Sequence, residues 1–173
     1  MAKTWKKDRH GVIRFSVTSD GTTGPQWIPR LMKMGKRISD YGMGSLLSPD
    51  FKPTRGVTTK VVVLPGEMFF KEEDRATTER IRDEARPRLG AFAPNAETAC
   101  LTREMFSDED LKDMGFVYIA VCHEPIRVYG CHVPGHPNIL SVSRHGYGHW
   151  LDAFSGKPDR RWNRHGAFAF DEG

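Results

Sequence analysis

The sequence has few cysteines, no long apolar run and none of the short motifs that mark the common enzyme classes. Its three cysteines form an odd and sparse set, which does not suit a small secreted scaffold held by disulfides. Apolar runs such as Val61–Leu64 are far shorter than the roughly 20 residues that a membrane helix needs. A phosphate loop, a dinucleotide fingerprint, a metalloprotease helix and a nucleophile elbow are all missing. We therefore expect a cytoplasmic protein with reduced thiols and no membrane partner.

The length of 173 residues is that of one ordinary domain. No repeat or low-complexity stretch divides the chain, so residues 1–173 are predicted to form a single domain. Residues 1–10 carry Lys3, Lys6 and Lys7 without an apolar pattern and are predicted to be a flexible basic tail.

Charge is distributed unevenly, although the net charge is only +4. Residues 1–61 hold 12 Lys and Arg against 4 Asp and Glu, whereas residues 62–115 hold 8 against 13. A basic surface attracts phosphates through Coulomb forces that salt screens. The distribution favours an anionic partner, although a merely solvated surface is the more common reason for such a charge.

Apolar spacing predicts strands over residues 12–19 and 57–64, and helices near Trp27–Met32, over 71–86 and over 95–105. Because Pro29 has no amide proton, the first helix should be capped no earlier than about Gln26. Ser107 and Asp110 have the spacing of a capping box, which predicts a short helix at residues 108–114 that Gly115 ends.

The C-terminal third has the pattern of an antiparallel sheet. The apolar run at residues 116–122 predicts a central strand, and further strands are expected at 138–144, 149–154 and 166–170. The predicted fold class is α+β: an antiparallel sheet, mostly from the C-terminal third, packed against helices from the N-terminal and middle regions.

Six of the seven histidines fall between residues 123 and 165. Histidine titrates near neutral pH and can serve as general acid or base. One hypothesis is therefore a small histidine-based or metal-dependent hydrolase, whose catalytic residues are His123, Glu124, His145 and His149.

A metal site in the same segment is a weaker prediction. Zinc takes four nitrogen or sulfur ligands, and His145 and His149 are expected to face each other across a hairpin. The other candidate ligands are Cys131 and His136. Histidines that simply decorate turns and strand ends explain the pattern more often, so no cofactor is predicted.

Basic residues surround Trp162 near the C-terminus. Arginines pair with phosphates, and a tryptophan can stack on a base, so the mixture suits single-stranded nucleic acid. The alternative is that Trp162 packs into the sheet while the arginines stay in water. The candidate binding residues are Arg144, Arg160, Arg161, Trp162 and Arg164.

Three segments carry a resemblance to known sequences: 48–54 (SPDFKPT), 123–126 (HEPI), and Arg161-Trp162 with the closing 166–170 (GAFAF). They resemble a group of uncharacterised bacterial proteins of the kind encoded by accessory or mobile gene cassettes. The resemblance implies a bacterial cytoplasmic origin and assigns no activity to any residue.

Taken together, these patterns favour a binding or interaction module for an anionic partner, either nucleic acid or a phosphorylated ligand. The hydrolase is the alternative. Because an open sheet must protect its edges, a homodimer formed through the β-rich end is also expected.

Overall fold

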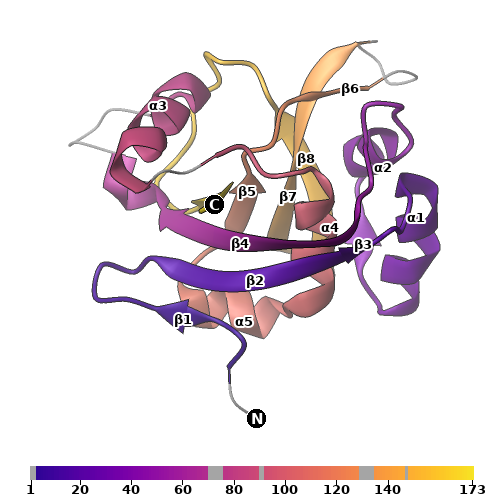
Figure 1. Ribbon diagram of the computed structural model, residues 1–173, viewed down its shortest axis with the longest axis horizontal. Helices are drawn as coiled ribbons and strands as arrows, with labels where there is room; N and C mark the ends of the chain where they lie inside the picture. Colours follow the sequence, from indigo (N-terminus) through magenta and orange to yellow (C-terminus); the bar gives the residue numbers. More distant parts are fainter. Residues whose placement is uncertain (1–2, 70–75, 90–91, 129–134, 147) are drawn as a thin grey trace.

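The computed structural model describes residues 3–69, 76–89, 92–128, 135–146 and 148–173. It is an α+β fold, as predicted, with a nine-stranded sheet and five helices in the described ranges. Figure 1 shows the long strands β2 and β4 crossing the molecule, with α1 and α2 at one end and α3 at the other.

The strands are β1 (Lys6–Lys7), β2 (Ile13–Asp20), β3 (Arg37–Ile38), β4 (Arg55–Pro65), β5 (Tyr118–Val121), β6 (Ile126–Val128), β7 (His136–His145), β8 (Gly148–Ser155) and β9 (Ala167–Asp171). Their order in the sheet is β1-β2-β4-β9-β5-β7-β8-β3, and β6 also pairs with β7. The β5–β9 and β3–β8 pairs are parallel and the others are antiparallel. The N-terminal half therefore supplies more of the sheet than its sequence pattern predicts.

The helices are α1 (Gly24–Lys33), α2 (Asp40–Leu46), α3 (Thr78–Leu89), α4 (Glu97–Met105) and α5 (Asp108–Met114). A short 3₁₀ helix spans Gly66–Phe69. None of the described helices is long and apolar enough to cross a membrane.

Helix α1 begins earlier than predicted. Thr23 is its N-cap, and Thr23 and Gln26 form a reciprocal capping box. Pro29 lies inside the helix. The prediction of a cap near Gln26 was wrong because the capping box satisfies two backbone amides, which offsets the one hydrogen bond that Pro29 cannot donate.

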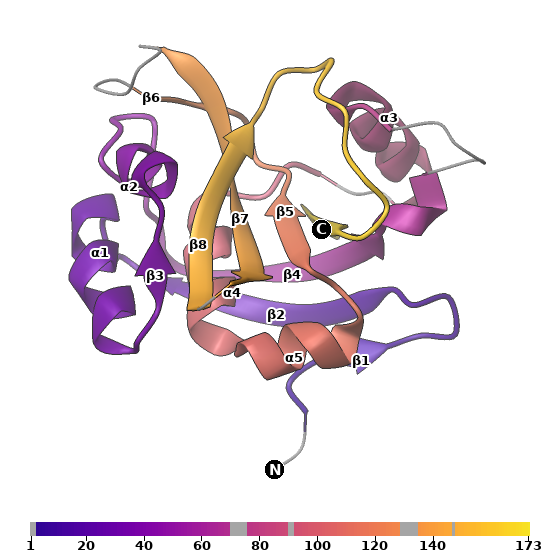
Figure 2. The ribbon, with the colours of Figure 1, turned by 180° about the vertical axis from the view of Figure 1, so that it is seen from behind.

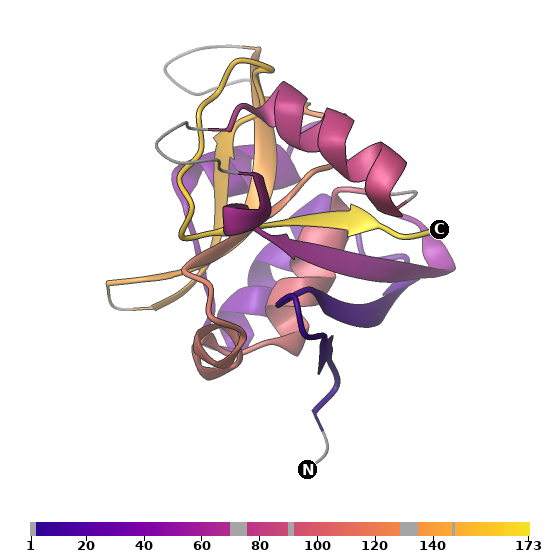
Figure 3. The same ribbon diagram turned by 90° about the vertical axis from the view of Figure 1, so that its left-hand side faces the viewer.

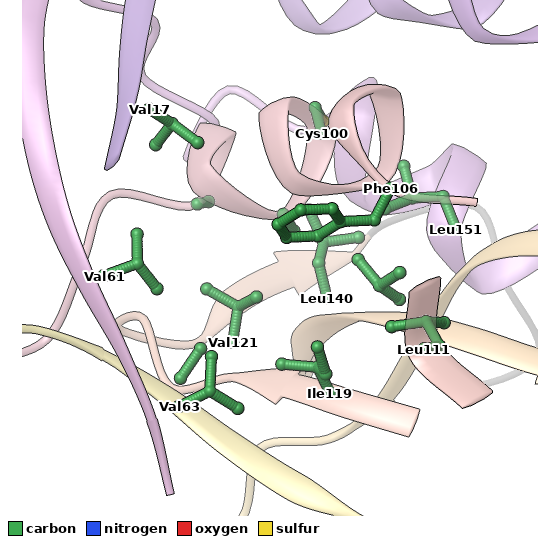
Figure 4. Packing of buried hydrophobic residues seen from close by; sticks show 14 of the residues in the cluster. Val17, Val61, Val63, Cys100, Phe106, Leu111, Ile119, Val121, Leu140 and Leu151 are labelled. Atoms are coloured by element: carbon green, nitrogen blue, oxygen red, sulfur yellow. The ribbon is translucent and has the colours of Figure 1, made fainter. Parts of the chain in front are cut away.

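Two apolar cores lie on opposite faces of the sheet. The larger core packs α1, α4 and α5 against the sheet, and Figure 4 shows Phe106 and Cys100 of this helical layer above Val121 and Leu140. The smaller core lies on the other face and contains Ile81 and Ala85 of α3. Figure 3 shows α3 and α5 on opposite sides of β4 and β9. The helices thus cover both faces of the sheet.

Part of the segment predicted as a flexible tail, residues 5–7, lies against the sheet. Trp5 is buried in the larger core, and Lys6–Lys7 form β1 at the edge of β2. Both outer strands of the sheet, β1 and β3, are only two residues long. In the described residues they pair only with Ile13 and Arg14 of β2 and with Trp150 and Leu151 of β8, so most of the outer side of β2 and of β8 has no strand partner.

Candidate functional site

The segment between β8 and β9, residues 156–166, crosses the face of the sheet that carries the smaller core. We refer to these residues as the strap. Figure 2 shows it arching from the end of β8 toward α3 before it returns to β9. Its backbone is tied down, because the amides of Thr78 and Glu79 at the start of α3 donate to the carbonyls of Arg160 and Pro158. The strap is therefore a fixed part of the fold.

Trp162 anchors the strap. The residue is 3% exposed, and its Nε1 donates to the Thr78 hydroxyl over 2.8 Å. Tyr118, Phe154 and Phe168 surround it, with ring centres 5.3–5.8 Å from its own. Trp162 belongs to the core, so the interpretation that it stacks on a bound base is wrong.

Arg160 lies over this aromatic cluster. Its guanidinium carbon is 4.7 Å from the ring centre of Trp162 and 5.0 Å from that of Phe154. In the described parts of the chain no carboxylate forms an ion pair with Arg160, and its buried Nε has no hydrogen-bond acceptor. Burial lowers the pKa of Arg160, which reports that its charge has lost part of its hydration.

Two cavities meet at Arg160. One, of about 230 Å³, lies between the strap and the sheet face. The other, of about 260 Å³, lies toward α2 and β6. Phe154 and Arg160 line both. We refer to the two cavities together as the strap site.

The first cavity has an aromatic wall and a polar wall. Tyr118, Phe154 and Trp162 form the aromatic wall. The polar wall contains Ser143, His145, Asp152 and Arg161. Such a mixture of apolar area with a few oriented polar groups is typical of sites for small ligands.

His145 and Asp152 form a pair at the rim of this cavity. Nε2 of His145 lies 3.6 Å from Oδ2 of Asp152, and the imidazole stacks on Trp150 with ring centres 5.5 Å apart. Arg37 lies over the same indole at 5.7 Å. The rim therefore presents two basic side chains beside one carboxylate.

His123 has a structural role. It is 1% exposed, its Nδ1 donates to the Glu124 carbonyl, and its Nε2 accepts the amide of Leu140 over 2.9 Å. Burial lowers its pKa to about 4, so the ring is neutral at physiological pH. Both nitrogens are occupied, which leaves neither for proton transfer with a substrate.

The other three residues of the predicted catalytic set do not join His123. Glu124 points to solvent, 4.0 Å from Arg82. His149 lies 3.0 Å from Asp108 of α5, on the face of the sheet that carries the larger core. His145 pairs across the hairpin with Gly148 and not with His149, so the predicted facing pair of histidines is wrong. Neighbouring strand positions alternate between faces, and the turn register places these two histidines on opposite sides.

The candidate metal ligands are also dispersed. Cys131 lies outside the described residues. His136 and His145 stand at the two ends of β7, and His149 contacts α5. Within the described ranges no three His, Cys, Asp or Glu side chains form a group that could hold a metal ion.

The candidate arginines divide between three places. Arg160 and Arg161 share the strap site. Arg144 donates to the Phe116 carbonyl over 2.7 Å. Arg164 lines a separate cavity of about 300 Å³ with Lys7 and His165.

Most of the residues that line the strap site were missed from the sequence, among them Tyr118, Ser143, Asp152 and Phe154. A usable signal existed for two of them, since Trp150, Asp152 and Phe154 alternate along β8 and must share a face. Comparison with protein-family models, with curated proteins and with solved structures finds no match to this chain.

Proposed function

We propose that the protein binds an anionic, phosphate-bearing ligand in the strap site. The observation that carries this proposal is the environment of Arg160: a guanidinium that is partly desolvated over two aromatic rings and has no carboxylate partner in the described residues. Desolvating a charge costs free energy unless an opposite charge compensates it. A bound phosphate would supply that charge through two parallel hydrogen bonds.

The residues that line the strap site favour a ligand with negative charge. Arg160 and Arg161 contribute two positive charges, and Asp152 is the only carboxylate among the described lining residues. His136 and His145 add charge when protonated. Because Arg160 is held by stacking and the strap is hydrogen-bonded to α3, little side-chain entropy is lost on binding.

The hydrolase hypothesis receives less support. In the part of the chain that the structure describes, each of the two cavities holds a single histidine, His136 in one and His145 in the other. A division of general acid and general base between two histidines needs both beside the same bond. The geometry favours a binding protein.

Isothermal titration with inorganic pyrophosphate at low salt tests the proposal. We expect binding that weakens as salt rises, and a loss of about tenfold to a hundredfold in Arg160→Gln, because a hydrogen bond to a charged group contributes about 1.5–3 kcal/mol. Arg9→Gln is the matched control, since it removes the same charge from an exposed turn outside the strap site. Absence of binding at low salt, or equal losses in the two variants, overturns the proposal.

A further inference from the structure

We propose that the ligand is a nucleotide unit whose base presents two adjacent N–H donors, as guanine does, with its phosphate at Arg160, which lines both cavities, and its base edge at Asp152. This inference rests on the proposed function and adds the class of ligand. It is based on the difference between the aromatic wall and the polar wall of the first cavity.

The aromatic wall gives one flat ring an apolar surface to lie beside. Of its three side chains Phe154 is partly exposed, whereas Tyr118 and Trp162 are buried and do not stack on the ligand. Tyr118, Phe154 and Trp162 lie within 6 Å of one another by ring centre and are fixed by edge-to-face and tilted contacts. A cavity of about 230 Å³ is smaller than most sites for whole ligands, so it holds one ring system and not a larger molecule. The second cavity, which also contacts Arg160, gives the rest of the ligand room to continue.

Asp152 determines which hydrogen-bonding groups the edge of that ring must carry. Its Oδ1 accepts the amide of Ala153 over 2.8 Å, and its Oδ2 faces His145 at 3.6 Å. An ionised carboxylate only accepts hydrogen bonds. The Asp152 carboxylate would repel any negatively charged part of a ligand placed beside it. A ligand with a phosphate at one end therefore binds more tightly if its other end directs N–H donors toward Asp152.

The two hydroxyl groups that line this cavity already have partners. The Tyr118 hydroxyl donates to the Asn163 carbonyl over 3.2 Å, and the Ser143 hydroxyl lies 3.1 Å from that of Ser141. The two oxygens of the ionised Asp152 carboxylate each have a further lone pair besides the contacts with Ala153 and His145, so Asp152 can still accept hydrogen bonds from a ligand. Among the bases, guanine has two neighbouring N–H groups on its Watson–Crick edge, which match the two oxygens of one carboxylate.

The same unit can be a free nucleotide or one residue of a single-stranded nucleic acid. Unstacked bases of single strands are recognised by contacts with aromatic side chains together with edge hydrogen bonds. Titrations with guanosine 5′-monophosphate and with a short oligoguanylate of the same concentration distinguish the two sources, since only the second should gain from neighbouring basic residues such as Arg37.

Calorimetric titration at one fixed salt concentration tests the inference with guanosine, inosine and adenosine 5′-monophosphates. Inosine lacks the 2-amino group, so we expect it to bind about tenfold more weakly than guanosine, and adenosine to bind at least as weakly as inosine. Asp152→Asn should remove the preference for guanosine over adenosine. Asp159→Asn, an exposed position of the strap that lines neither cavity, is the control and should retain it.

Three results would overturn the inference, and they are distinguishable. Equal affinity for the three nucleotides, still sensitive to Arg160→Gln, contradicts the assigned base edge and leaves anion binding intact. A preference for guanosine that survives Asp152→Asn contradicts the role of Asp152. No binding of any nucleotide or of pyrophosphate contradicts the proposed function itself.

Discussion

The guanidinium carbon of Arg160 lies 4.7 Å from the ring centre of Trp162, whose own Nε1 donates to the Thr78 hydroxyl. This arrangement connects the strap, the start of α3 and the aromatic wall of the strap site. Cation–π contacts of this kind contribute about 0.5–2 kcal/mol, depending on how far the pair is desolvated. They orient Arg160 without neutralising its charge, which leaves that charge for a ligand.

Protonation of His123 should destabilise the fold. Its pKa falls from about 6.5 to about 4 on folding, so the unfolded chain binds the proton more readily, and stability is lost as pH falls through this window. Complete protonation would cost about 3 kcal/mol. Urea unfolding of the wild type and of His123→Gln at pH 7 and pH 4 measures the effect. The stability gap between the two proteins should narrow by about that amount, and an unchanged gap would contradict the buried neutral histidine.

Asp108→Asn should weaken the junction between α4 and α5. Arg103 is fully buried, and the carboxylate of Asp108 is its partner at 3.4 Å. Removal of one partner of a buried pair leaves an uncompensated charge, and because the Asp108 side chain is 26% exposed we expect a loss of about 2 kcal/mol.

Chemical denaturation of Asp108→Asn beside Asp113→Asn provides the comparison. Asp113 is exposed on the same helix and should change stability by no more than about 0.5 kcal/mol. If both variants lose the same amount, the loss comes from the charge of α5 in general and not from the pair with Arg103.

Gly166→Ala should disrupt the aromatic wall of the strap site. A Cβ at this position would lie 2.0 Å from the ring of Tyr118, which cannot move freely because Phe154, Trp162 and Phe168 pack around it. Overpacking of a core costs about 1–3 kcal/mol, and this contact lies at the upper end of that range or beyond it.

Thermal unfolding of Gly166→Ala, Tyr118→Leu and the double variant tests the cause. The smaller leucine removes the clash, so the double variant should lose clearly less than the sum of the single losses. Additive losses would show that Gly166 is needed for a reason other than contact with Tyr118.

Local signals explain most of what the sequence predicted correctly. Ser107 and Asp110 form the predicted capping box, and Gly115 ends α5 with a φ of +93° that favours glycine. The hairpin of β7 and β8 and the buried strand β5 were also predicted, because apolar alternation and turn residues act over a few positions.

Contacts between distant segments explain what was missed. The packing of α3 on the face opposite to α4 depends on Ile81 and Ala85 meeting Phe168 and Trp162, about 80 residues away, and no local pattern encodes that choice. His123 was predicted as a catalytic residue because its partner, the Leu140 amide, can be known only from the sheet. The homodimer and the cytoplasmic location stay predictions.

The most direct measurement follows the side-chain Nε–Hε resonance of Arg160 in ¹⁵N-labelled protein during titration with guanosine 5′-monophosphate. The Nε group has no hydrogen-bond partner in the described structure, so a bound phosphate should shift its resonance in a saturable manner. The indole resonance of Trp5, which lies in the other core, should stay in place. An Arg160 resonance that does not move while the nucleotide binds elsewhere would contradict the strap site.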